Sequence, residues 1–155
     1  MKDYQANAAR RVVEGLRLYR RGLRQIETGE QGAAKKTAAD IARLCLADMH
    51  AQNIELVAEA PLRTVTEKEV TQAVARTEEA TNILRRIMED GRDEEARHVE
   101  RLANDAPWYR RSEIKQQAET RLAEFVSMVR EVVSIYYEAE AKISLAALLA
   151  KEAAA

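Results

Sequence analysis

The fold is decided by residues 118–146, which read AETRLAEFVSMVREVVSIYYEAEAKISLA. Apolar residues recur here at alternating steps of four and three positions, which places them on one face of an α-helix. The members of this seam are Ala118, Leu122, Phe125, Val129, Val132, Tyr136, Ala139, Ile143 and Ala146. Because no Gly or Pro interrupts residues 112–151, we predict one continuous helix of about 40 residues, about 60 Å long.

The apolar surface of this long helix is wider than a single seam. Val126, Met128, Val133 and Ile135 lie beside the seam positions, so the apolar arc exceeds the narrow stripe of a two-stranded coiled coil. A helix with such an arc contacts two or more neighbours. We therefore predict that residues 112–151 form the spine of a helical bundle.

The composition is typical of a helical protein. Of the 155 residues, 33% are charged and 5% aromatic, and the chain contains only five Gly and two Pro. This length suits one domain with a single core. We predict one all-α domain over residues 1–155, an antiparallel bundle of four long helices and one short helix.

Glycine and proline divide the chain before the spine into further helices. Thr28-Gly29 should end the first helix, with Gly32 closing a short turn, and Pro61 cannot continue the second helix. The expected helices cover residues 3–28, 33–58, 67–90 and 93–104.

Three signals set the remaining boundaries. Thr66 and Glu69 have the spacing of a capping box, which would start the third helix. We expect Asp90-Gly91 to break or sharply kink that helix, so that a shorter helical piece follows it. The last helix then begins either near Asp105, which would cap it, or near Ser112.

The first helix contains a local repeat. Gly15-Leu16-Arg17 and Gly22-Leu23-Arg24 recur seven residues apart, beside the apolar seam. Glycine costs about 1 kcal/mol relative to alanine inside a helix. Two glycines in register therefore indicate that a neighbouring helix packs closely against this edge.

The charge is uneven along the chain, although the formal net charge is only -1. Residues 1–28 hold seven basic and three acidic residues, whereas residues 66–105 hold seven basic and eleven acidic ones. Opposite signs on two helical segments favour pairing within the fold.

Nucleic-acid or phosphate-surface binding is the alternative use of these arginines. Trp108 and Tyr109 stand beside two further arginines, where an aromatic ring could stack on a base. For this corner we favour a structural interpretation, in which Trp108 plugs the end of the bundle. The candidate phosphate contacts are Arg10, Arg17, Arg20, Arg21, Arg24, Arg110 and Arg111.

The only spacing that resembles a metal motif is Glu95 and His98, three residues apart on one helical face. Di-iron bundles use two such pairs and two further Glu ligands, but this sequence has no second pair and only two His. We therefore expect an exposed histidine in a charged helix, with no resident metal or cofactor, and keep a metal-binding bundle as a second alternative.

No catalytic signature is present in the sequence. It lacks a Gly-rich phosphate loop, a nucleophile with a recognisable partner and a Cys-x-x-Cys pair, so we predict that the protein is not an enzyme. The single cysteine, Cys45, lies between two leucines and is expected to be a buried, reduced thiol.

Membrane and export signals are also lacking. The N-terminus has no apolar core of a signal peptide, and the uncharged run over residues 143–150 is far shorter than the ~20 residues of a membrane span. We predict a protein of the cytoplasm or of a particle assembled inside the cell.

These observations together favour a non-enzymatic assembly or interaction protein, such as a scaffold, an adaptor or a structural subunit. It would act by packing its helices in a homo-oligomer or a larger complex, because a bundle of this size leaves part of a 60 Å apolar helix uncovered. The expected partner contacts are Val126, Val133, Tyr137, Ile143, Leu145, Leu148 and Leu149.

Overall fold

The computed structural model describes the backbone of residues 2–154 and the side chains of residues 6–138. Within this range the chain forms four α-helices, one 3₁₀ turn and no strand, which confirms the predicted all-α class. The elements are α1 (Lys2–Glu27), α2 (Gln31–Glu59), α3 (Glu67–Asp105), η1 (Trp108–Arg110) and α4 (Arg111–Ala154).

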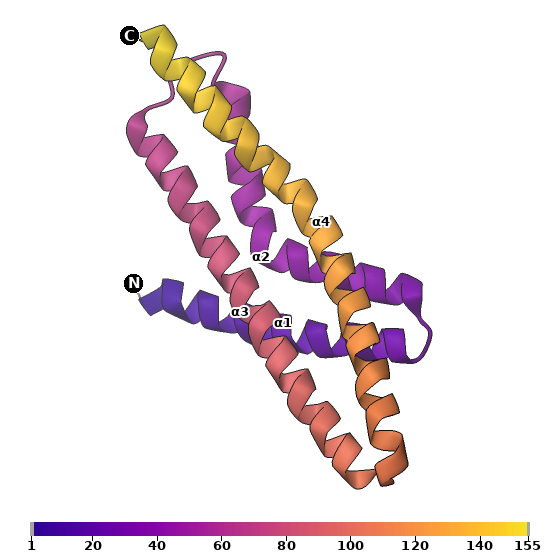
Figure 1. The fold of residues 1–155 in the computed structure, drawn as a ribbon. Helices are drawn as coiled ribbons and strands as arrows, with labels where there is room; N and C mark the ends of the chain where they lie inside the picture. Colours follow the sequence, from indigo (N-terminus) through magenta and orange to yellow (C-terminus); the bar gives the residue numbers. More distant parts are fainter. Residues whose placement is uncertain (1, 155) are drawn as a thin grey trace.

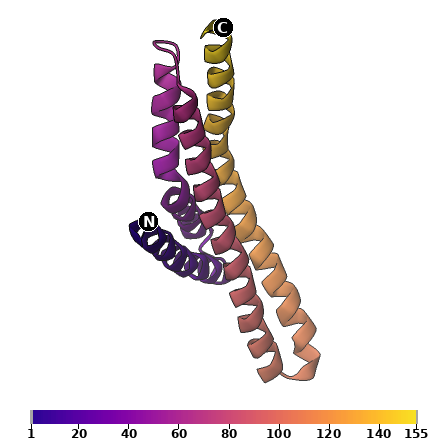
Figure 2. The same cartoon turned by 90° about the vertical axis from the view of Figure 1, so that its left-hand side faces the viewer.

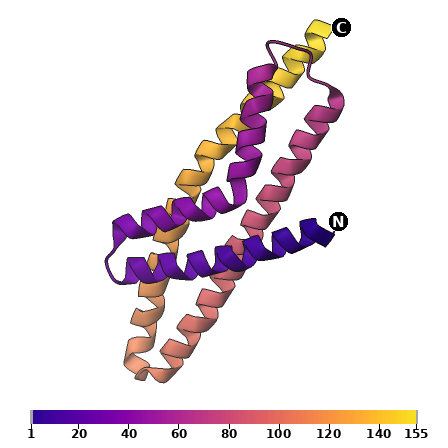
Figure 3. The ribbon, with the colours of Figure 1, turned by 180° about the vertical axis from the view of Figure 1, so that it is seen from behind.

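The helices form two layers (Figures 1 and 2). Helices α3 and α4 run antiparallel as a long hairpin, and α1 with the first half of α2 forms a second hairpin that crosses it on one side. Helix α2 bends near its middle, so that its second half runs alongside α3 and α4 (Figure 3). The end of the α3–α4 hairpin around η1 therefore projects beyond α1 and α2 (Figure 2).

The main core lies where the two hairpins cross. Tyr19 of α1, Ile41 of α2, Ile87 of α3 and Phe125 of α4 are fully buried in one apolar cluster. The rings of Tyr19 and Phe125 meet edge to face, with their centroids 5.4 Å apart, a favoured geometry for aromatic pairs. These contacts hold the two layers together.

The predicted seam of the last helix faces this core over its first half. Ala118, Phe125 and Val129 are buried, and Leu122 and Tyr136 are half-buried side chains that lie beside them. The seam positions from residue 139 onward lie outside the described side chains. As predicted, α4 is the longest helix and is uninterrupted.

Helix α3 continues without a break through Gly91, so the predicted end at Asp90 is wrong. The expected separate helix over residues 93–104 is the second part of α3. The glycine at this position has a tertiary explanation, because Gly91 is buried and a Cβ there would lie 2.7 Å from Cγ of Tyr19. This glycine allows one helix to approach another and does not end its own helix.

The glycine repeat of α1 has the close neighbours that the sequence predicted. A Cβ on Gly15 would lie within 2.2 Å of the Ile87 side chain, and one on Gly22 within 2.1 Å of the Phe125 ring. Real Cβ atoms do not approach other heavy atoms so closely. Both glycines therefore bring α1 close to the α3–α4 hairpin.

The structure corrects the predicted role of Gly32 and decides between the two predicted starts of the last helix, in favour of the one near Ser112. Gly29 has a φ of 80°, as its place after α1 predicted, but Gly32 lies inside the first turn of α2 and not in the connection. Asp105 is the last residue of α3 and caps no following helix. The last helix begins at Arg111, directly after η1.

The predicted capping box at the start of α3 is confirmed. The Thr66 hydroxyl accepts a hydrogen bond from the backbone N–H of Glu69 at 3.2 Å, and the Glu69 carboxylate accepts one from the backbone N–H of Thr66, also at 3.2 Å. This reciprocal pair satisfies two of the backbone donors that a helix start leaves unpaired.

Candidate interaction surface on the α3–α4 hairpin

Large apolar side chains are exposed at the projecting end of the α3–α4 hairpin. Leu102, Trp108 and Tyr109 are 43%, 79% and 67% exposed, and the rings of Trp108 and Tyr109 meet edge to face with centroids 6.0 Å apart. The prediction that Trp108 plugs the end of the bundle is therefore wrong. The hairpin extends past α1 and α2 here, so neither of these helices covers its end (Figure 2).

The local sequence explains why these aromatic residues stand at the turn. Ala106 has an extended backbone, with φ -88° and ψ 158°, as the residue before a proline favours. Pro107 then directs the chain into η1, which carries Trp108 and Tyr109 between the two helices. We call Leu102, Trp108 and Tyr109 the hairpin tip.

A second exposed apolar feature lies along α4. It is a shallow hollow of about 360 Å³, and we call its lining residues the α4 strip. Every one of them belongs to α4. The α4 strip consists of Glu119, Leu122, Ala123, Val126, Ser127 and Arg130.

The centre of the α4 strip, formed by Ala123 and Ser127, faces away from the main core, whereas Leu122 at its edge also packs against the core cluster. Ala123 and Ser127 are exposed, and Leu122 and Val126 are half-buried. At about 100° per residue, Ala123 and Ser127 each lie about 160° around the helix from Phe125, which points at α1. One side of α4 thus builds the core, and the other side presents small and apolar groups to solvent.

A neighbouring hollow between α3 and α4 extends this apolar surface towards the hairpin tip. It measures about 290 Å³ and is lined by Val99 of α3 and by Ala118 of α4, among others. It shares Glu119 and Leu122 with the α4 strip. The two hollows therefore form one continuous surface on the hairpin.

The structure places the predicted partner contacts in different environments. Val126 lines the α4 strip, whereas Val133 packs against the core cluster. The Tyr137 hydroxyl lies 2.7 Å from the hydroxyl of Thr81 on α3, within hydrogen-bonding distance. The other four, Ile143, Leu145, Leu148 and Leu149, lie outside the described side chains.

Sequence reasoning missed Leu102 and Ala123 as surface candidates. Leu102 directly precedes the buried Ala103, so it falls off the core side of its helix. The helical periodicity of α3 indicates that Leu102 is exposed. We did not recognise this because we expected residues 93–104 to form a separate short helix. Ala123 gave no signal, because a small residue is compatible with a core position and with an exposed one.

Arginines of α1 pair with acidic residues of α3, as the uneven charge predicted. Nη2 of Arg24 donates to both carboxylate oxygens of Glu95, at 2.6 and 2.5 Å, and Nη1 of Arg20 donates to Glu94 at 2.6 Å. Arg17 instead pairs with Glu14 on its own helix, through Nε at 3.0 Å.

The remaining candidate phosphate contacts are exposed but lie apart. Arg10 and Arg21 are exposed on α1, and Arg110 and Arg111 are exposed at the hairpin end. These two pairs belong to different layers of the molecule (Figure 1). The structure therefore does not gather all seven arginines into one basic patch.

The Glu95 and His98 pair is engaged by an arginine. Glu95 is buried and both of its oxygens accept from Arg24, while Nη1 of Arg24 lies 3.4 Å from Nε2 of His98. His98 is half-buried, not exposed as expected. Among the described residues, no three acidic, His or Cys side chains are grouped to hold a metal ion.

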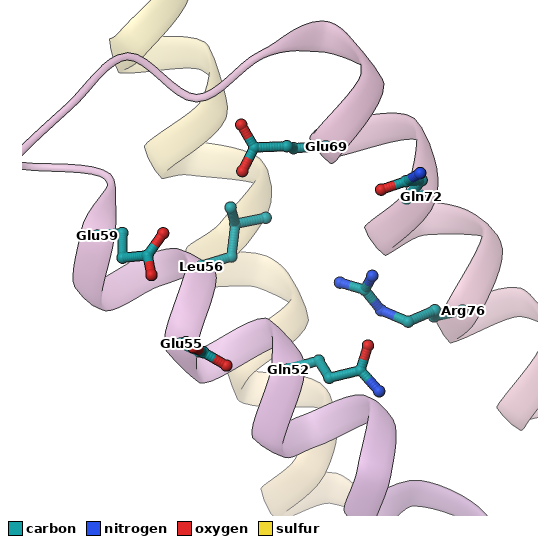
Figure 4. A pocket seen from close by; sticks show the side chains of 7 residues that line it. All are labelled: Gln52, Glu55, Leu56, Glu59, Glu69, Gln72 and Arg76. Carbon is teal, nitrogen blue, oxygen red and sulfur yellow. The ribbon is translucent and has the colours of Figure 1, made fainter.

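A polar pocket of about 210 Å³ lies between α2 and α3, near their connection (Figure 4). Arg76 reaches from α3 towards α2 across this gap, and three glutamates, Glu55, Glu59 and Glu69, line the pocket with it. Two of them, Glu59 and Glu69, accept hydrogen bonds from Arg63 in the connecting loop, at 2.6 and 2.8 Å. These hydrogen bonds connect the loop to the end of α2 and to the start of α3.

The pKa of Glu69 reflects these hydrogen bonds. The hydrogen bond from Arg63 is the main cause that lowers the pKa of Glu69 to about 2, and the bond from the Thr66 backbone adds to it. The carboxylate is therefore charged throughout the neutral range. It stabilises the loop and the start of α3 together.

Cys45 is buried, as expected. Desolvation by burial raises the pKa of its thiol to about 12. The thiolate is the reactive form of cysteine, so Cys45 is chemically inert in the folded protein at neutral pH.

Comparison of this chain with protein-family models, with curated proteins and with solved structures finds no match. Within the described part of the chain, no helix combines the length and the apolar character that crossing a membrane requires.

Proposed function

We propose that this protein is a non-enzymatic interaction protein, acting as a scaffold, an adaptor or a structural subunit through its α3–α4 hairpin. The observation that carries this proposal is the hairpin tip, where Leu102, Trp108 and Tyr109 remain exposed. Its partners are proteins, either further copies of this chain or other components of an assembly. A single free thiol, Cys45, fits a reducing compartment, so we place this activity inside the cell.

The chemistry of the hairpin tip supports protein binding. Trp and Tyr are enriched in the cores of protein interfaces, because each buries a large area at a small cost in side-chain entropy. Arginine is enriched there as well, and Arg110 and Arg111 are exposed beside the two aromatic residues. A helical hairpin presents these groups on regular secondary structure, which lowers the ordering cost of binding.

Site-specific photo-crosslinking in the cells that make the protein tests this proposal. A photoreactive amino acid replaces Tyr109 in the full chain, and the matched control replaces Lys36, which is exposed on α2. We expect discrete protein adducts from position 109 and none from position 36. The absence of discrete adducts at position 109 would contradict the proposal.

Single-stranded nucleic-acid binding is a second candidate, and the same corner supports it. Exposed aromatic rings beside exposed arginines allow base stacking together with phosphate contacts. Against it, Arg20 and Arg24 are already paired with Glu94 and Glu95. Titration with an oligonucleotide at low salt, followed by Trp fluorescence, tests it: quenching that R110Q/R111Q abolishes favours this candidate, and unchanged fluorescence ends it.

A further inference from the structure

We propose that the α4 strip binds a second copy of this chain, as an antiparallel pair of α4 helices related by a two-fold axis. This inference rests on the proposed function and names one partner, the chain itself. It concerns a different surface from the hairpin tip, so the two can be tested separately.

The shape of the α4 strip suits a facing helix. Ala123 and Ser127 lie exposed at its centre, and Leu122 and Val126 line the hollow beside them. Small residues at a contact let two helices approach to the short end of the usual 8–10 Å interaxial range. Leu122 and Val126 then bury apolar surface that solvent reaches in the monomer.

The charges at the two ends of the α4 strip select the partner and its direction. Glu119 stands at one end and Arg130 at the other, eleven residues or about 16 Å apart along the helix. Both side chains are exposed, and neither forms an ion pair within the described residues. Each is therefore available to a partner.

An antiparallel second copy satisfies both charges at once. It places Glu119 of each chain against Arg130 of the other, and two-fold symmetry repeats this pair on both sides of the axis. Ala123 of each chain then faces Val126 of the other across the centre. A parallel arrangement would set Glu119 against Glu119, and juxtaposed like charges are costly at an interface.

Charge-reversal variants test this arrangement by analytical ultracentrifugation across a dilution series at low salt. E119R alone and R130E alone each create two like-charge contacts per dimer, so we expect each to weaken dimerisation by about tenfold or more. The double variant E119R/R130E restores both ion pairs with their direction exchanged. An equimolar mixture of the two single variants restores them between unlike chains, so both should dimerise as the wild type does.

The matched control is E131R, which makes the same charge change on the same helix. Glu131 is exposed and lies about 100° around the helix from Arg130, off the α4 strip. E131R should leave dimerisation unchanged. Circular dichroism melts of every variant establish that any loss of dimer is not a loss of folding.

Two results would overturn the inference. One is a wild-type chain that stays monomeric at every concentration, and the other is a dimer that the single reversals leave intact or that the double variant and the mixture fail to restore. Neither result touches the proposed function, because adducts from position 109 report on the hairpin tip. Loss of those adducts, in turn, leaves a dimer through α4 unaffected.

Discussion

Glycines set how closely the two hairpins approach each other. Gly22 of α1 lies against the ring of Phe125 on α4, and Gly91 of α3 lies against the ring of Tyr19 on α1. In both pairs the missing Cβ makes room for an aromatic ring from the other layer. The crossing of the hairpins therefore depends on these positions more than on helix propensity.

Gly91→Ala should destabilise the protein, although alanine is the better helix former. A Cβ would lie within 3.0 Å of three atoms of the buried Tyr19 ring, and overpacking of a core typically costs 1–3 kcal/mol. We expect a net loss of about 1–2 kcal/mol in the free energy of unfolding, measured by urea denaturation.

Gly32→Ala is the matched control for this substitution. No atom lies within 4 Å of a Cβ built on Gly32, so the gain in helix propensity is unopposed and stability should rise by up to about 1 kcal/mol. Equal effects from the two substitutions would contradict the assigned role of Gly91.

Arg24 neutralises the buried carboxylate of Glu95 at the crossing of α1 and α3. Arg24→Met keeps an apolar stem but leaves Glu95 buried and unpaired. Because the arginine itself is partly exposed, we expect a loss of about 2 kcal/mol, less than for a fully buried pair.

Two comparison variants complete this test by urea denaturation. Arg17→Gln breaks a pair with Glu14 that solvent already screens, so it should cost clearly less stability than Arg24→Met. The double variant R24M/E95M removes both charges and should cost less than R24M alone. A double variant that is less stable than R24M would show that Glu95 does not need its arginine.

At the scale of an element, α3 shows how local and tertiary signals combine in one helix of 39 residues. Its start is fixed locally, by the capping box of Thr66 and Glu69. The glycine in its middle, Gly91, is explained by the Tyr19 ring of another helix, which packs against it. Its end is again local, because Pro107 forces Ala106 into an extended backbone.

The start of α3 should lose stability in acid. The pKa of Glu69 falls from its ordinary value of 4.5 to about 2 on folding. A lowered pKa in the folded state means that the contribution is complete above about pH 4.5 and is lost as the pH falls towards 2. The stability difference between wild type and E69Q should therefore shrink over that range.

Urea denaturation at a series of pH values measures this difference. Glu67→Gln is the control, because Glu67 is exposed in the same helical turn and is not part of the capping box. A difference between wild type and E69Q that is independent of pH would contradict the assigned role of Glu69.

At the scale of the whole molecule, the core and the proposed interaction surface are separate. The main core lies at the crossing of the two hairpins. The hairpin tip lies where the α3–α4 hairpin projects beyond α1 and α2 (Figure 2). Substitutions at the tip should therefore change binding without changing folding.

Trp108 and Phe125 test this separation. Trp108→Ala should change the free energy of unfolding by less than about 0.5 kcal/mol, because its side chain is mostly exposed. Phe125→Ala, in the core, should cost about 3–5 kcal/mol. A large loss in the free energy of unfolding on Trp108→Ala would contradict this separation and support the view that Trp108 plugs the end of the bundle.

Fluorescence gives a second measurement, since Trp108 is the only tryptophan of the chain. Its emission in the folded protein should match that of the unfolded chain, and a partner that covers the hairpin tip should shift it to shorter wavelength. A native emission already shifted to shorter wavelength would contradict the exposure of Trp108.

Much of this architecture follows from the sequence alone. The heptad spacing over residues 118–146 determined a long last helix with Phe125 and Val129 in the core, and Thr66 with Glu69 determined the start of α3. The sign of the charges on residues 1–28 and 66–105 indicated the pairing of α1 with α3. All of these are set by residues near one another in the chain or by simple periodicity.

Only the tertiary structure decided what Gly91, Trp108 and the outer side of α4 do. The local sequence around Gly91 is the same whether this glycine ends a helix or makes room for an aromatic ring of another helix. The local sequence around Trp108 is likewise the same whether its side chain is buried or exposed. The α4 strip is defined by the neighbours that α4 lacks on that side. Whether a residue is buried depends on which segments, distant in the sequence, pack against it. The crossing of the two hairpins leaves the hairpin tip and the α4 strip exposed.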